Sequence, residues 1–227
     1  MHATTIRDHP ELQRLTAILP VDAELDRLGA ALAAAEAAEV TARATVRAQR
    51  DRAEALERQL RAGAVDARGR QSLLLERAGL TVEEGLAPAL LADVARTRAR
   101  CELLYLARVA TLAEALATVA KADHAAAFDA WQGPAQQLDS LSHTTLEQHD
   151  ESRAIGRATV APLAATVAAC AARYEQSQAL LALARALGER HHGEALDLRR
   201  GESIEAAATA AGDRAARHVV APSPVAA

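Results

Sequence analysis

The sequence predicts an all-α protein, an elongated helical bundle or coiled coil built from three long helices and short accessory helices. Of its 227 residues, 60 are Ala and 30 are Leu, the two strongest apolar helix formers. The four aromatic residues are too few for a β-sheet core, which draws on β-branched and aromatic side chains. The third observation is a long heptad ladder in the first quarter of the chain, and it predicts the shape of the first long helix.

This ladder places residues at alternating steps of four and three from Val21 to Leu60, and most of them are apolar. A period of 3.5 residues predicts one narrow stripe along a helix over about residues 21–61, roughly 60 Å long. Glu39 and Gln49 interrupt the apolar character of the stripe. We expect the ladder to be a seam between helices, and the residues that mark it are Val21, Leu25, Leu28, Leu32, Val46, Leu56 and Leu60.

Residues 1–20 predict a short N-terminal amphipathic helix, and residues 21–218 a long-helix bundle. The pair Asp8 and Glu11 has the spacing of a helix start, and Pro20 ends this first helix. After the ladder helix, the glycine- and proline-containing segment 79–88 predicts a break in the chain.

A central helix is expected over residues 89–130. Its run from Leu103 to Leu106 is apolar on all sides, which predicts that neighbouring helices surround it. Trp131 and Gly133, followed by Pro134, then predict a hairpin turn.

The remaining chain predicts a third long helix over residues 135–187, kinked at Gly156 and Pro162, because proline removes a hydrogen-bond donor and clashes with the preceding turn. A charged connector follows, then a short helix over residues 203–217. Residues 219–227 are expected to form a flexible tail.

Composition limits where the protein acts. The formal net charge is −4, and the N-terminal residues show no apolar secretory segment. Cys101 and Cys170 fall on apolar helix faces, as buried free thiols do in a reducing compartment, so we expect a cytoplasmic protein. The uncharged stretch 159–172 is too short for a transmembrane segment.

Charge is segregated along the ladder helix, with a net charge of −4 over residues 21–39 and +4 over residues 41–70. Two antiparallel copies would place unlike halves together, which favours a homo-oligomer or a helical protein partner. The basic half, with Arg96, Arg98 and Arg100, could also contact nucleic acid. Interleaved acids, the negative net charge and the lack of an aromatic stacking platform argue against nucleic acid.

The sequence points to no catalytic, cofactor-binding or metal-binding residues. A Glu-x-x-His spacing occurs at Glu189 and His192, but di-iron bundles use that pair twice, and here it occurs once. Gly188 and Gly193 flank it, so we interpret it as a solvated polar turn. No cofactor is expected, and the protein is expected not to be an enzyme.

Trp131-Gln132-Gly133, between two expected long helices, resembles the Trp-x-Gly hairpin of WXG100-type proteins, which are helical substrates of type VII secretion. The resemblance covers at most residues 89–186. It implies an antiparallel helical dimer and export without a signal peptide. The Tyr-x-x-x-Asp/Glu export signal of such proteins is absent, since Tyr174 is followed four residues on by Gln178.

These features favour a non-enzymatic structural or assembly protein that acts through helix–helix contacts and self-associates. The alternative is a type VII-like exported helical hairpin protein. A metal-binding helical-bundle enzyme is the third possibility.

Overall fold

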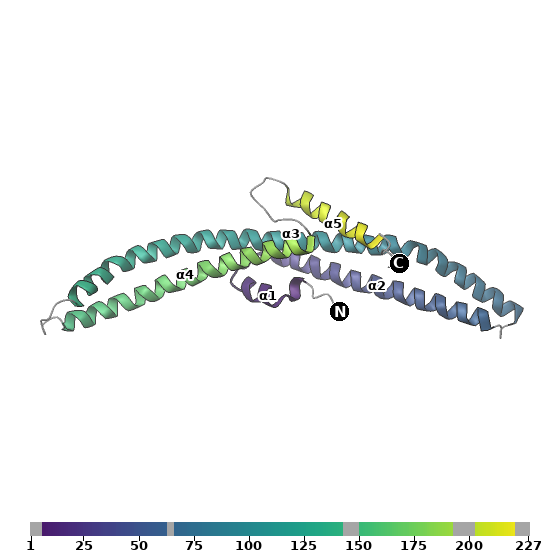
Figure 1. The fold of residues 1–227 in the computed structure, drawn as a ribbon, viewed down its shortest axis with the longest axis horizontal. Helices are drawn as coiled ribbons and strands as arrows, with labels where there is room; N and C mark the ends of the chain where they lie inside the picture. The colour runs from purple at the N-terminus through teal and green to yellow at the C-terminus, as the bar shows by residue number, and fades with distance from the viewer. Residues whose placement is uncertain (1–5, 63–65, 143–149, 193–202, 221–227) are drawn as a thin grey trace, which may run out of the picture. The chain divides into compact units, whose positions relative to one another are not determined.

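The computed structural model confirms the all-α helical bundle. It describes residues 6–62, 66–142, 150–192 and 203–220, and these contain helices and no strand. In chain order the elements are the 3₁₀ turn η1 (Ile6–Asp8) and the α-helices α1 (Pro10–Thr16), α2 (Ala23–Ala62), α3 (Ala67–Ser142), α4 (Asp150–His192) and α5 (Ile204–Val220) (Figure 1). Three of these helices are long, as the sequence predicts.

Helices α2 and α3 begin next to side chains that accept hydrogen bonds from the unpaired N–H groups of the first turn. The Asp22 carboxylate accepts from the Leu25 N–H at 2.7 Å, and the Asp66 carboxylate accepts from the Gly69 N–H at 2.8 Å. Helix α1 is capped by His9, with Pro10 at its first position, rather than by the expected Asp8.

The chain divides into two compact units. Unit 1 comprises residues 1–21 and 108–186, and unit 2 comprises residues 22–107 and 187–227. Helix α3 contributes its C-terminal half to unit 1 and its N-terminal half to unit 2.

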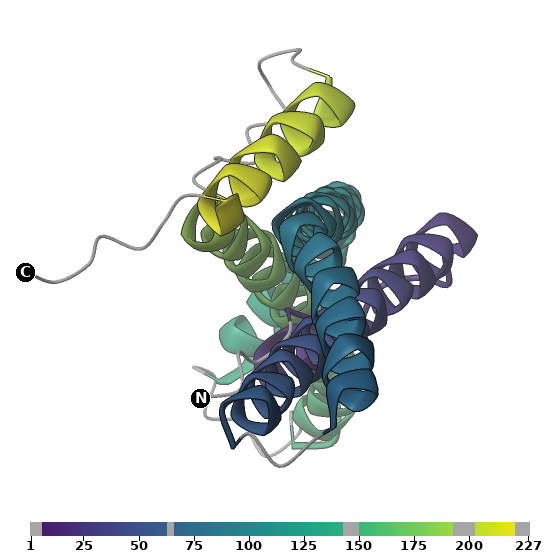
Figure 2. The same cartoon turned by 90° about the vertical axis from the view of Figure 1, so that its right-hand side faces the viewer.

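Unit 2 is an antiparallel hairpin of α2 and the first half of α3, with α5 along another side of α3 (Figures 1 and 2). Ion pairs fix the direction of the hairpin: Glu39 of α2 meets Arg98 of α3 at 2.8 Å, and Arg52 of α2 meets Glu76 of α3 at 2.7 Å. Because the partner residue number rises as the first falls along these contacts, the two helices run in opposite directions.

The heptad ladder follows the stripe of α2 on which the buried residues lie. Leu32 and Leu56 are fully buried, and Leu28, Ala35 and Ala42 are buried beside them. This burial occurs within one chain, so the seam is intramolecular in this structure. Leu25, Val46 and Leu60 are half-buried, and Val21, which precedes α2, is 98% exposed.

Unit 1 is a second hairpin, formed by the C-terminal half of α3 and by α4, with η1 and α1 contributing Ile6, Leu12 and Leu15 to buried positions. The Arg153 side chain donates to the Leu141 carbonyl at 2.9 Å, and Gly156 lies against Leu138. Gly156 allows the two helices to approach closely at that point, because a Cβ there would lie 3.0 Å from the Leu138 side chain.

The expected breaks inside α3 were wrong. Residues 79–88 and the expected hairpin turn at Trp131 and Gly133 are helical, so the helix extends well beyond residues 89–130 on both sides. Glycine costs only about 1 kcal/mol in a helix, and a proline about 3 kcal/mol, which packing along a 76-residue helix can offset. Nothing lies within 4 Å of a Cβ built at Gly79, Gly85 or Gly133, so these glycines occupy open helical positions.

The expected third helix was also misplaced. Residues 135–142 end α3, and α4 begins at Asp150, so one expected helix is two. Pro162 lies inside α4. The short helix expected over residues 203–217 is confirmed as α5, which takes in Val219 and Val220 of the expected tail. Residues 221–227 of that tail lie outside the described residues.

Candidate functional site: a buried ion-pair cluster and an exposed helix face

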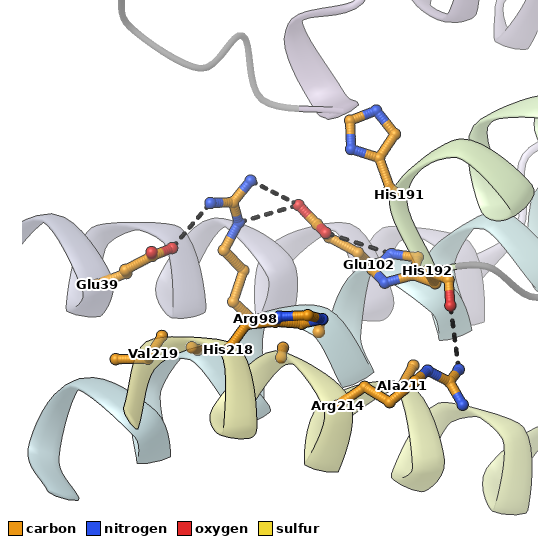
Figure 3. A pocket seen from close by; sticks show the side chains of 12 residues that line it. Glu39, Arg98, Glu102, His191, His192, Ala211, Arg214, His218 and Val219 are labelled. Carbon is orange, nitrogen blue, oxygen red and sulfur yellow. Dashed lines mark hydrogen bonds and ion pairs between the residues drawn. The ribbon is translucent and has the colours of Figure 1, made fainter. Parts of the chain in front are cut away.

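Unit 2 contains a cluster of buried charged side chains that joins four helix segments (Figure 3). Glu39 comes from α2, Arg98 and Glu102 from α3, His192 from the last turn of α4, and Arg214 from α5. The side chains of Glu39, Glu102 and His192 are 8%, 6% and 4% exposed, so each requires a partner.

Arg98 lies at the centre of this cluster. Its guanidinium meets Glu39 at 2.8 Å and Glu102 at 2.8 Å, and Glu39 also pairs with Arg43 of its own helix at 2.5 Å. Burial alone would lower the pKa of Arg98, but the hydrogen bond to Glu39 and the charge of Glu102 outweigh it, and the pKa is raised above its ordinary value. The charge of Arg98 is therefore permanent.

His192 completes the cluster from the end of α4. Its Nε2 atom lies 3.3 Å from Glu102 Oε2, and its backbone carbonyl accepts a hydrogen bond from Arg214 at 3.0 Å. The latter contact satisfies one of the carbonyls left unpaired at a helix C-terminus. Burial by itself would raise the pKa of Glu102, but the neighbouring His192 side chain and the charge of Arg98 reverse the effect, so the pKa of Glu102 is lowered.

Helix α5 is held on α3 beside the cluster. Arg96 meets Asp213 at 3.1 Å and Arg100 meets Glu205 at 2.9 Å. Gly212 allows the close approach, since a Cβ there would lie 2.8 Å from the Arg96 carbonyl oxygen. The three arginines considered as a nucleic-acid surface, Arg96, Arg98 and Arg100, are thus paired with acids in the folded chain.

A partly open cleft of about 630 Å³ adjoins the cluster, lined by Glu39, Arg98, Glu102, His191, His192, Arg214 and His218 with small apolar residues. Among the described residues that line it there is no Ser, Thr, Cys, Tyr or Lys to serve as a nucleophile. Its acids are engaged by Arg98, which fits a structural role. Within the described residues, no three His, Cys, Asp or Glu side chains are placed to hold a metal ion.

Sequence reasoning missed most of this cluster. Glu39 was identified as an interruption of the ladder, and a carboxylate on a buried stripe should have predicted a cationic partner. The expectation of a solvated turn at Glu189–His192 was wrong for His192, which is buried. No local pattern indicates that His192 meets a residue 90 positions earlier.

Unit 1 contains a second candidate site, the outer face of α4. The inner residues of this helix, at steps of three and four from Arg153 to Ser177, are half-buried or buried. Among the exposed positions between residues 154 and 172, Arg157, Thr159 and Thr166 are polar. The exposed residues on the side opposite the inner residues are otherwise apolar: Ala154, Ile155, Ala158, Ala161, Pro162, Ala165, Ala168, Ala169 and Ala172. We call this set the α4 outer face.

Aromatic side chains gather on the same hairpin. Phe128 and Trp131 have ring centroids 5.5 Å apart, and Phe128 is 41% exposed. A cleft of about 310 Å³ near Lys121, His124 and Tyr174 adjoins them. Trp131 therefore packs along a helix and does not fill a hairpin turn.

By length and composition, α3 and α4 each contain an 18-residue stretch apolar enough to cross a membrane. Half of the α3 stretch is buried in the fold, and none of the α4 stretch is. A core helix of a soluble protein passes the same test, so the exposed α4 stretch is the one that requires an explanation.

Comparison with known proteins gives no family: no family model, no curated protein and no solved structure matches this chain.

Proposed function

We propose that this protein is a non-enzymatic structural or assembly protein that acts through helix–helix contacts, and that the α4 outer face is the surface it uses. One observation carries the proposal: an exposed, mostly apolar helix face about 27 Å long, on which Arg157, at one edge, is the charged side chain between residues 154 and 172. The face of a helix that points to water is ordinarily polar. An apolar face of this length is typical of a surface that a partner covers.

The chemistry of the face favours a helical partner. Most of its side chains are Ala, and small residues let two helix backbones approach closely. The neutralised cluster of unit 2 supports a scaffold role, because its charges are directed at one another and hold α2, α3, α4 and α5 of that unit together.

Site-specific photocrosslinking in cells tests this proposal. A photoreactive residue replaces Ala165, in the middle of the α4 outer face, and in a matched control it replaces Ala126, an exposed residue of α3 in the same unit. We expect adducts from position 165 in which mass spectrometry identifies a helical segment, and few from position 126. Equal yields at the two positions would overturn the proposal.

A further inference from the structure

We infer that the partner of the α4 outer face is a second copy of this chain, paired antiparallel about Ala165. This inference rests on the proposed function and names its partner. It follows from the charged residues beside the face. The face itself consists of similar apolar residues, which do not favour one pairing direction over the other.

Two charged residues lie on the same side of the face. Arg157 precedes Ala165 by about two turns and Glu175 follows it by nearly three. At about 100° per residue, both lie roughly 80° to the same side of Ala165. Both are exposed, and no ion pair joins either to another described residue, while Glu175 lines the same cleft as Lys121 of α3.

An antiparallel pair satisfies these two charges. When two copies of α4 cross at Ala165, a two-fold axis brings the same side of each helix together. Arg157 of one copy then lies within about 3 Å along the axis of Glu175 of the other, and the contact occurs twice. In a parallel two-fold pair the same side of each helix lies at opposite edges of the interface, so neither charge would meet an opposite charge.

A lipid bilayer fits the same surface less well. The α3 segment that packs against residues 154–172 carries exposed Asp123, Asp129 and Asp139. Carboxylates at that depth of a bilayer are costly, so the hairpin as a whole is unsuited to insertion.

Charge reversal in the full-length chain tests the pairing. Sedimentation equilibrium should show a concentration-dependent dimer, because a narrow alanine face buries less area than a standard interface. Arg157→Glu and Glu175→Arg should each raise the dimer dissociation constant about tenfold or more. The double variant should return it to within about threefold of the original, since the charges are exchanged but still opposite.

Cysteine crosslinking tests the direction in a chain carrying Cys101→Ala and Cys170→Ala. Ala165→Cys should form an intermolecular disulfide, because the two copies meet at that residue. Ala158→Cys should not, although an equal mixture of Ala158→Cys and Ala172→Cys chains should. Efficient self-crosslinking of Ala158→Cys would indicate a parallel pair and overturn the inference.

A monomer at all concentrations, or a dimer unaffected by both single reversals, would also overturn it. If the chain is monomeric while position 165 still crosslinks to a different helical protein in cells, self-pairing fails and the proposed function stands. Circular dichroism of each variant confirms folding, which surface changes at exposed positions should leave intact.

Discussion

Glu39 and Arg98 are 59 positions apart in the sequence, and their charged groups lie 2.8 Å apart between α2 and α3. The glutamate occupies a position where the heptad ladder calls for an apolar residue. Its burial is possible because Arg98 reaches it from the neighbouring helix while also neutralising Glu102. This contact gives the hairpin of unit 2 a specific register, which the many similar alanines along it cannot supply.

Removing Arg98 should destabilise unit 2 strongly. Among the described residues, Arg98→Ala leaves Glu39 with Arg43 alone and Glu102 with His192 alone, and we expect a loss of about 1.5–3 kcal/mol in the free energy of unfolding. Urea denaturation measures the loss. Arg58→Ala, at an exposed position of α2, should change stability by less than about 0.5 kcal/mol. Comparable effects at the two positions would show that the cluster is not a structural core.

Acid should weaken the fold through Glu102. Because the folded-state pKa of Glu102 is lowered, its contribution to stability is complete above the ordinary glutamate pKa of about 4.3 and is lost as the pH falls through the folded-state value. Glu102→Gln should therefore lower stability at pH 7 and flatten the acid limb of a stability-against-pH profile. Asp51→Asn, an exposed control on α2, should leave that limb steep. An acid limb unchanged by Glu102→Gln would exclude this carboxylate as its source.

A single methyl group at Gly212 should loosen α5. Gly212→Ala places a Cβ 2.8 Å from the Arg96 carbonyl oxygen, and backbone atoms cannot move away as a side-chain end can. We expect faster hydrogen exchange across α5 and a lower melting temperature. Gly133→Ala is the matched control, because its Cβ meets nothing within 4 Å. In α3 that change should stabilise the helix by about 0.5–1 kcal/mol.

The ladder can be tested at its buried and exposed members. Leu32→Ala removes a fully buried side chain of α2 and should cost about 2–5 kcal/mol. Val21→Ala, at a residue that is 98% exposed, should have almost no effect. Both are measured by urea denaturation at one protein concentration. If Leu32→Ala were as mild as Val21→Ala, the ladder would not be packed within the chain.

The sequence was sufficient to predict the all-α class and the buried stripe of α2. Composition and the 3.5-residue period can be read along the chain without knowing which helices pack together. The sequence was insufficient for the ends of α3. Local signals at Gly79–Pro88 and Trp131–Pro134 predicted breaks, but their cost is a few kcal/mol, and packing along the helix overrides it. The partners of Glu39 and His192 depend on which helices meet, and the sequence pattern does not contain that information.

The small side chains of the core restrict how this protein can evolve. Ala107, Ala110, Ala113, Ala120 and Ala208 are at most 1% exposed. A larger residue at such a position must push a helix away, at a cost of about 1–3 kcal/mol. These five positions should therefore tolerate little beyond alanine, glycine or serine. The abundance of alanine is thus partly a record of how closely the helices approach.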